Sequence, residues 1–346
     1  MSSDSRPLVS IVIKALNEEK HIAAAIESAL AALDEVGGEV ILADSASTDR
    51  TIEIARRYPI KIVTLNSADD RSCGAGGQLG FQHSRGRYIY LIDGDMKMRR
   101  GFLPAAIRYL EGHGAVAGVG GILTEHERHN REFVQRVQRG ELSIRPGTAL
   151  RLDGGGLYRR SAIESVGYFT DRNLHGGEET ELGARLRARG WTLARIVVPA
   201  VDHRGHAGNA YRLLLRRITS RGAWGSGESV RAAFGRAHFP LIFQENNTLK
   251  LCFAVHGWWL SMLACLFLIK SWPLAIAAML GVLLLPVAAM SLRWRSLSVG
   301  LYSVAAWNTY AICFLPGLLR RRVSPTAWIE SSVIKDVPVL SELKAG

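Results

Sequence analysis

The chain has 346 residues, 48% of them hydrophobic, and a formal net charge of +12. The length allows about two domains. The charge indicates a polyanionic partner, which on charge alone is nucleic acid, an anionic membrane surface or a diphosphate substrate. The four cysteines form no CxxC pair, which argues against a disulfide framework and against a zinc site.

The first two hundred residues alternate short apolar runs with helical patterns. The first run is too short for a signal peptide, so we expect this part to stay in the cytoplasm. The predicted strands are Leu8–Ile13, Glu39–Ala43, Ile60–Leu65 and Tyr88–Ile92, and the predicted helices are His21–Leu33, Thr51–Arg57 and Gly76–Ser84. Strands and helices at this spacing predict an α/β fold with a mostly parallel sheet. In such sheets the ligand lies beyond the carboxyl ends of the strands.

Two polar clusters follow the first two strands. Asn17-Glu18-Glu19 stand after the first strand, either as nucleotide-sugar contacts or as an acidic helix start. After the second strand, Asp44 is placed to accept hydrogen bonds from a base or a ribose, and we assign Asp49 to the cap of the following helix.

The strand Tyr88–Ile92 ends in Asp93-Gly94-Asp95. Two carboxylates around a glycine can reach one hard cation, which prefers oxygen ligands and also binds substrate phosphates. A surface turn is the alternative reading, since Asp and Gly are common in turns.

A fourth cluster, Gly176-Gly177-Glu178-Glu179, leads into a helix that ends near Gly190. In a group-transfer site one of these glutamates can act as general base toward an acceptor hydroxyl. The alternative is the acidic first turn of an ordinary helix.

Three apolar segments follow a basic stretch in the C-terminal part: Leu251–Ile269, Trp272–Leu292 and Leu297–Leu319. Each is near the ~20 residues that cross a bilayer. Arg320-Arg321-Arg322 would lie outside if all three crossed, against the positive-inside rule. We therefore favour two crossings and a third segment that is re-entrant or interfacial.

Together, the four clusters resemble the inverting family-two glycosyltransferases with the GT-A fold, over roughly Leu8 to Gly205. The resemblance implies that Asp44 contacts the nucleotide, and that Asp95, supported by Asp93, binds Mg²⁺ or Mn²⁺. It implies that Glu179 takes the position of the catalytic Asp, with Glu178 as the second candidate base. The segment Asp153-Gly154-Gly155 is similar to the acceptor-side loop, and His203 is similar to a late metal-binding histidine.

Three departures from the family pattern stand out. An arginine that often faces the donor is missing around Gly76–Gly80, and Arg71 in the same loop is placed to compensate. The loop at Asp44 has one carboxylate fewer. No Gln-x-x-Arg-Trp motif is present, which argues against a processive synthase.

We therefore predict a membrane-bound, non-processive glycosyltransferase that moves a sugar from a nucleotide-diphosphate sugar, UDP- favoured over GDP-, to a lipid-linked acceptor. The acceptor is a polyprenyl-diphosphate saccharide or a glycolipid, with polyprenyl phosphate as the alternative, and Arg221 is the candidate contact to an acceptor phosphate. The rivals are a nucleotidyltransferase, a dehydrogenase, which the missing GxGxxG disfavours, and an inactive membrane scaffold. Nucleic acid is not an expected partner, because the basic residues gather beside the apolar segments.

The predicted organisation is a catalytic domain at 1–205, a basic amphipathic interface segment at 206–248, transmembrane helices at 249–322 and a cytoplasmic tail at 323–346. We expect a multi-pass protein of the inner (cytoplasmic) membrane with its catalytic domain in the cytoplasm.

Overall fold

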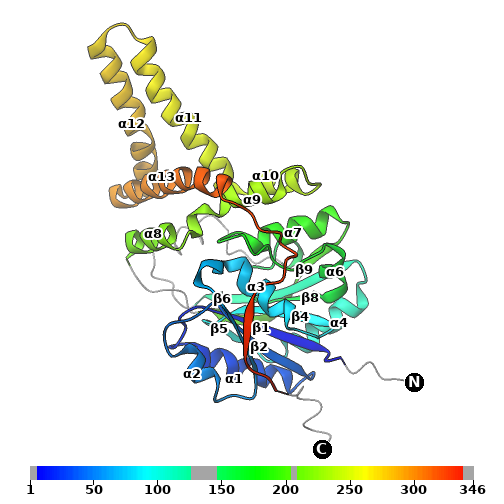
Figure 1. Cartoon of the computed structure of the whole chain (residues 1–346). Helices are drawn as coiled ribbons and strands as arrows, with labels where there is room; N and C mark the ends of the chain where they lie inside the picture. Colours follow the sequence, from blue (N-terminus) through cyan, green and yellow to red (C-terminus); the bar gives the residue numbers. More distant parts are fainter. Residues whose placement is uncertain (1–5, 126–145, 204–208, 338–346) are drawn as a thin grey trace, which may run out of the picture.

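The computed structural model describes residues 6–125, 146–203 and 209–337. These residues form an α/β domain topped by a layer of short helices, from which a long helical hairpin projects (Figure 1). The domain boundary predicted at residue 205 lies outside the described residues.

The first half of the α/β domain follows the predicted alternation closely. Its elements are β1 (Val9–Ala15), α1 (Ile22–Leu33), β2 (Gly38–Asp44), α2 (Thr51–Ala55), β3 (Lys61–Leu65), η1 (Ala68–Asp70), α3 (Cys73–Gln82) and β4 (Tyr88–Asp93). The second half comprises β5 (Met96–Met98), α4 (Phe102–Gly112), β6 (Val116–Glu125), β7 (Gly147–Ala149), β8 (Gly156–Arg159), α6 (Arg160–Ser165), α7 (Glu178–Ala188) and β9 (Thr192–His203).

One mixed sheet runs through the domain in the order β10-β3-β2-β1-β4-β8-β6-β9-β5, with β7 paired to β9 off this path. The pairs between β3, β2, β1 and β4 are parallel, as predicted. From β8 onward antiparallel pairs enter, because β8 runs against both β4 and β6.

Both faces of the central strands are buried, which explains their nearly continuous apolar sequences. Alternate side chains of a strand point to opposite faces. Val9, Ile11 and Ile13 therefore pack with α1 and α4, whereas Val12 packs with α3, α6 and α7 on the other face.

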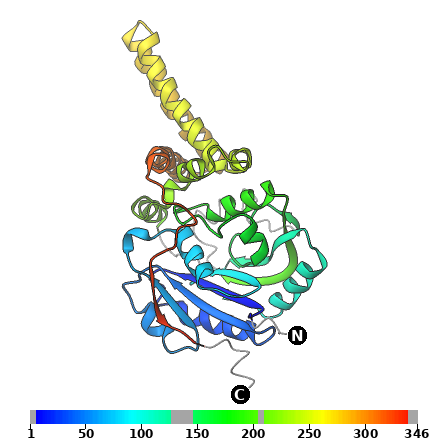
Figure 2. The same ribbon diagram turned by 45° about the vertical axis from the view of Figure 1, so that its right-hand side comes forward.

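The remaining helices lie beyond one side of this domain. They are α8 (Ala210–Thr219), η2 (Gly222–Trp224), α9 (Gly225–Ala233), α10 (Phe239–Glu245), α11 (Asn247–Leu268), α12 (Trp272–Trp294) and α13 (Leu297–Leu319). Helices α11 and α12 form the projecting hairpin, and α13 lies across its base above α8 and α9 in both views (Figures 1 and 2).

Helices α11 and α12 are long and apolar enough to cross a membrane by length and composition, and little of either is buried within the protein. Side chains such as Phe267 and Leu292 are 83% and 79% exposed. A soluble core helix would bury such groups, so the hairpin presents a large exposed apolar surface, of the kind that marks an interaction site.

The segment that follows α13 returns to the α/β domain. Strand β10 (Ser331–Lys335) pairs antiparallel with β3 at the edge of the sheet, where the sequence analysis expected only a tail. Ile329, just before it, is fully buried among the side chains around α3.

Candidate active site

The predicted site residues converge at the carboxyl ends of three adjacent strands. In the parallel register Ala15 of β1 lies opposite Asp44 of β2, and Lys14 lies opposite Asp93 of β4. The first three polar clusters therefore meet at one edge of the sheet, as parallel strands require. The fourth, at the start of α7, reaches this edge through the contact of Glu178 with Lys14.

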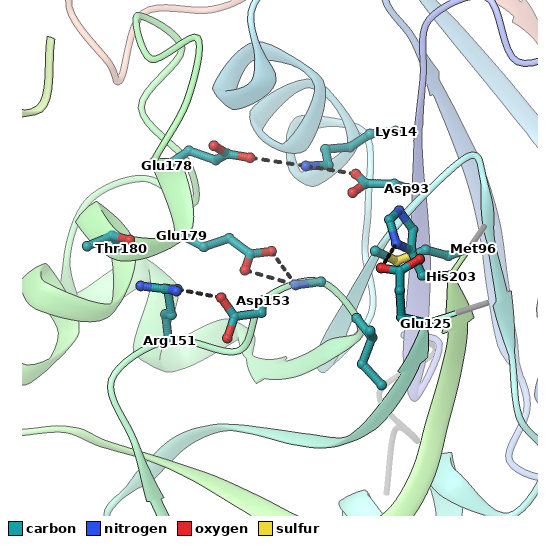
Figure 3. A pocket seen from close by; sticks show the side chains of 13 residues that line it. Lys14, Asp93, Met96, Glu125, Arg151, Asp153, Glu178, Glu179, Thr180 and His203 are labelled. Carbon is teal, nitrogen blue, oxygen red and sulfur yellow. Dashed lines mark hydrogen bonds and ion pairs between the residues drawn. The ribbon is translucent and has the colours of Figure 1, made fainter. Parts of the chain in front are cut away.

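Two cavities open at this edge. Cavity A, of about 340 Å³, is lined by Glu18, Ser45, Arg71, Asp95 and Arg216 among others. Cavity B, of about 390 Å³, is lined by Glu125, Arg151, Asp153, Glu179 and His203 among others (Figure 3). Lys14, Asp93 and Glu178 line both cavities and form their common wall.

Lys14 holds this common wall together. Its Nζ lies 3.0 Å from Oδ1 of Asp93 and 3.2 Å from Oε1 of Glu178, between the two carboxylates in Figure 3. Burial alone would lower the pKa of Lys14, but Asp93 and Glu178 raise it well above its ordinary value. The site thus contains a fixed cation of its own.

Asp95 and His203 form the second charged pair of the site. Nε2 of His203 lies 3.3 Å from Oδ2 of Asp95, and its Nδ1 lies 2.7 Å from Oε2 of Glu125. Burial would lower the pKa of His203, but the hydrogen bonds to Asp95 and Glu125 raise it to about 10. Strand pairing explains the contact, because His203 of β9 lies opposite both Met96 of β5 and Glu125 of β6.

Glu18 is the third carboxylate near Asp93 and Asp95. Burial, followed by the charges of Asp95 and Asp93, raises the pKa of Glu18 to about 7. Within the described residues, no group of three or more His, Cys, Asp or Glu side chains is arranged to hold a metal by itself. Asp95 offers an oxygen ligand, and His203 would offer a nitrogen ligand once a metal displaces its proton. Such a pair suits Mn²⁺ better than Mg²⁺, which prefers oxygen ligands, and substrate phosphates would complete the shell of either ion.

Glu179 lies on the wall of cavity B. Both of its carboxylate oxygens accept the Gly154 N–H, at 2.8 and 2.9 Å. Burial raises the pKa of Glu179 to about 8, although Lys14 acts in the opposite direction. The helix that carries it begins after Gly177, whose φ of +79° is readily adopted only by glycine.

The loop Asp153-Gly154-Gly155 has three successive positive φ values, of 54°, 73° and 68°. Asp153 is held there by Arg151 and by Nη2 of Arg195, the latter at 3.3 Å. The left-handed turn aims the Gly154 N–H at Glu179, so the predicted acceptor-side loop and the predicted base are in direct contact.

The loops after β1 and β2 hold each other. The Asn17 side chain accepts the Thr48 N–H at 2.8 Å, and Glu19 accepts the Arg50 N–H at 3.3 Å, so Asn17 and Glu19 bind the neighbouring loop while Glu18 faces cavity A. Asp49 accepts the Thr51 N–H at the start of α2, in the role assigned to it.

Asp44 is fully buried and binds Ser47 N and Thr64 Oγ1 through Oδ2. Its Oδ1 is buried with no hydrogen-bond partner in the described part of the chain. Arg71 lines cavity A and donates to the carbonyls of Ser45 and Ala46, which fixes the loop after β2.

Arg221, the predicted contact to an acceptor phosphate, lies at the end of helix α8. It has a φ of +61°, its guanidinium lies 5.6 Å from the Trp224 ring centroid, and it does not line cavity A or B. Arg216, on the preceding helix α8, lines cavity A instead. The left-handed turn at the end of α8 redirects Arg221, which a helical pattern does not reveal.

Lys14, Glu125 and Arg195 are site residues that the sequence analysis missed. A signal existed for Lys14, since it is the charged residue of an otherwise apolar strand. Glu125 and Arg195 become visible only through the pairing of β6 with β9.

Comparison with known proteins identifies the family. The model of Glycosyl transferase family 2 matches residues 10–167. The chain is 31% identical over 200 residues to the putative glycosyltransferase EpsE of Bacillus subtilis, covering 54% of this chain and 69% of that one. The chain belongs to glycosyl transferase family 2.

Two shorter matches agree with this family 2 assignment. The low-salt glycan biosynthesis hexosyltransferase Agl6 of Haloferax volcanii is 41% identical over 95 residues, which is 27% of this chain and 22% of that one. The dodecaprenyl-phosphate galacturonate synthase of Rhizobium johnstonii is 32% identical over 111 residues, or 30% and 32% of the two chains. The chain spans about a fifth to a third of the length of the first relatives that it matches.

Solved structures extend the likeness of this family 2 chain to its fold. The mannosyltransferase PcManGT of Pyrobaculum calidifontis, in complex with GDP-Man and Mn²⁺, matches with a TM-score of 0.56 and 20% identity over 90% of this chain and 88% of that one. S. aureus TarS 1-349, in complex with UDP-GlcNAc, matches with a TM-score of 0.52 and 15% identity over 91% and 93% of the chains. The α/β domain is therefore GT-A-like.

Proposed function

We propose that this protein is a membrane-anchored, inverting glycosyltransferase. In this proposal a nucleotide-diphosphate sugar occupies cavity A, and the hydroxyl of a lipid-linked acceptor enters through cavity B. The observation that carries the proposal is the common wall of the two cavities, Lys14, Asp93 and Glu178. Transfer between two substrates needs such a meeting point, because the reacting atoms must approach within about 3–3.5 Å.

The nucleotide side of the proposal depends on Asp44, Arg71 and Glu18. We retain Asp44 as the acceptor for a base or ribose donor because its Oδ1 has no hydrogen-bond partner within the described residues, although its neighbour Ser45, and not Asp44 itself, lines cavity A. Among the structural neighbours one binds UDP-GlcNAc and the other GDP-Man, and we retain a UDP-sugar as the favoured donor.

The metal side depends on Asp95 and His203, with Asp93 in support. Burial first, and then the charges of Asp95 and Asp93, raise the pKa of Glu18, and a divalent cation would offset the part due to those charges. Mg²⁺ or Mn²⁺ bound to Asp95 and His203 would neutralise the leaving nucleoside diphosphate. Lys14 adds a positive charge at the same wall that comes from the protein itself and does not depend on a metal.

Glu179 is our proposed base, with Glu178 as the second candidate. A carboxylate whose pKa is raised to about 8 accepts a proton more readily than an ordinary one, and the Glu178 carboxylate is occupied by Lys14. Glu179 takes the proton of the acceptor hydroxyl while that oxygen attacks the anomeric carbon. The bond from that carbon to the diphosphate oxygen breaks on the opposite face, and the configuration inverts.

The membrane side depends on the exposed apolar hairpin α11–α12. Anchoring in the cytoplasmic membrane suits an amphiphilic acceptor, and the names of two relatives, a dolichyl-phosphate glucosyltransferase and a dodecaprenyl-phosphate galacturonate synthase, support such an acceptor class. We favour a polyprenyl-diphosphate saccharide over a glycolipid or polyprenyl phosphate.

Calorimetric titration of UDP and GDP into the detergent-solubilised chain, with and without Mn²⁺, tests the donor half. We expect tight binding of one nucleotide that requires the metal and is lost in Asp95→Asn. No binding of either nucleotide under any metal would refute it. For the acceptor half, membranes given labelled donor should yield organic-extractable label, and purely water-soluble product would contradict it.

A further inference from the structure

A third cavity, cavity C, lies next to cavity B on its membrane side. It measures about 280 Å³, and Arg151, Gly177 and Thr180 line both cavities. Its far wall contains Asn247 and Thr248, the first residues of the hairpin helix α11. The cavity therefore connects the proposed site of transfer with the base of the hairpin.

Three helices begin at cavity C. Gly177 and Thr180 belong to the start of α7, Gly225 and Ser226 to the start of α9, and Asn247 to the start of α11. A helix N-terminus carries a partial positive charge and unpaired N–H groups, and so favours an anion. A Cβ at Gly177 would lie 3.5 Å from the Ser229 hydroxyl, so the glycine keeps the backbone beside that hydroxyl uncovered, whereas Gly225 packs against the Gly176 carbonyl.

Two serine hydroxyl groups in the same wall make no hydrogen bond to the described part of the chain. Ser229 is 2% exposed and Ser226 is 8% exposed, and neither hydroxyl has a hydrogen-bond partner within the described residues. Neither hydroxyl oxygen is among the side-chain atoms of the described residues that are sealed from solvent without a partner, so both face the cavity. There they are free to donate to a ligand with acceptor oxygens.

The charges around the cavity are compatible with an anion. Arg151 lines it directly and also binds Asp153, which lines cavity B and not cavity C. The one acidic side chain among its lining residues, Glu245, is bound by both terminal nitrogens of Arg187. That carboxylate is therefore already neutralised by a partner outside the cavity.

An apolar path leads from cavity C toward the hairpin. Phe243 on α10 and Phe253 on α11 flank the lining segment Glu245–Thr248; their ring centroids are 6.0 Å apart, and they are 44% and 50% exposed. An anion-binding pocket beside exposed aromatic rings, at the base of the proposed membrane anchor, matches a phosphorylated lipid.

We infer that cavity C binds the phosphate or diphosphate group of the lipid-linked acceptor, with its lipid tail along Phe243 and Phe253 and its saccharide in cavity B. This inference rests on the proposed function and adds the place and the chemistry of acceptor recognition. Ser226, Ser229 and the N-termini of α9 and α11 bind the phosphate oxygens.

Titration of farnesyl diphosphate into the full chain in phosphatidylcholine nanodiscs, with UDP saturating cavity A, tests the inference. The double variant Ser226→Ala/Ser229→Ala should bind it ten-fold or more weakly, because hydrogen bonds to a charged group are lost. Alanine favours a helix at least as well as serine, so unchanged melting is expected. The matched control, Ser261→Ala/Ser271→Ala on the hairpin, should bind like the wild type.

Equal affinity of the double variant and the control would overturn the inference. Inorganic pyrophosphate binding as tightly as farnesyl diphosphate would also overturn it, since the site would then recognise a free phosphate instead of a lipid. Farnesol, which lacks the phosphate, should not bind. With Mn²⁺ present, binding of UDP or GDP in the same preparation reports on cavity A alone, so the absence of both would refute the proposed function and not the assignment of cavity C.

Discussion

The Lys14 ammonium lies 3.2 Å from the Glu178 carboxylate, although 164 positions separate the two residues in the chain. The same ammonium lies 3.0 Å from Asp93. One side chain from the first strand thus joins the strand-end carboxylate to the helix that carries both candidate bases.

We expect Lys14→Met to lower kcat by roughly 10²–10³, the range seen when one fixed electrostatic contact is removed from a transition state. The lost ammonium leaves Asp93 and Glu178 facing each other without a cation. Steady-state kinetics with labelled donor measure the effect.

Lys61→Met is the matched control. Lys61 is also a largely buried lysine in a strand, paired with Asp336 at 3.2 Å, but it lies away from the cavities. Both variants should lose some stability, and only Lys14→Met should lose kcat. Equal kcat losses in the two variants would contradict the role of Lys14.

The raised pKa of Glu179 predicts two pH dependences. An ordinary glutamate titrates near 4.5 and Glu179 near 8, so between these values the folded chain binds more protons than the unfolded one. The free energy of unfolding therefore falls as pH rises through this window. The difference in the free energy of unfolding between wild type and Glu179→Gln, measured with a denaturant, should decline from about pH 5 to about pH 8.

Activity should show the opposite trend, because a general base acts only when deprotonated. We expect kcat of the wild type to rise with pH and to level off above about 8. Glu178→Gln should show the same rising limb of the pH profile, with a lower kcat throughout. A pH profile that keeps the limb in Glu179→Gln but loses it in Glu178→Gln would assign the base to Glu178.

Much of this site follows from the sequence because parallel strands end together. Asp44 and Asp93 follow apolar runs, and a parallel sheet brings such positions to one edge. The family resemblance assigns both Asp95 and His203 to the metal, and in the structure Nε2 of His203 lies 3.3 Å from Oδ2 of Asp95.

Other contacts arise from tertiary pairing that local patterns do not encode. The role of Lys14 depends on a loop more than 150 residues away, and β10 is a five-residue strand whose partner β3 lies at the other end of the chain. The left-handed backbone at Arg221, which sets the direction of its side chain, is likewise not encoded in a helical pattern.

The return of the chain to the sheet predicts the membrane topology. Strand β10 pairs with β3, and Arg322 binds Asp171 at 2.8 Å, so the segment after α13 lies on the same side as the α/β domain. An even number of crossings is then required, and α11 and α12 supply two.

Cysteine labelling in intact cells checks this topology, in a background whose four native cysteines are replaced by serine. Ser271→Cys at the tip of the hairpin should react with a membrane-impermeant maleimide from outside. Ser324→Cys should react only after permeabilisation. Labelling of Ser324→Cys in intact cells would mean that α13 also crosses.

A buried carboxylate links the catalytic loop to the end of α13. Glu228 is fully buried and accepts hydrogen bonds from the His175 N–H at 2.8 Å and from Nη1 of Arg320 at 3.2 Å. His175 stands three residues before Glu178, so this contact fixes the approach to the candidate bases.

We expect Glu228→Gln to cost about 2 kcal/mol of stability, since hydrogen bonds to a charged group are weakened, and to lower kcat more than UDP affinity. His175 lines cavity A as well, but Glu18 and Arg71 are held by the loops after β1 and β2, so most of the nucleotide contacts should persist. Glu164→Gln, which changes an exposed carboxylate near Arg160, is the control and should alter neither quantity. A parallel loss of UDP affinity and kcat in Glu228→Gln would indicate general unfolding, and would contradict a positioning role for this carboxylate.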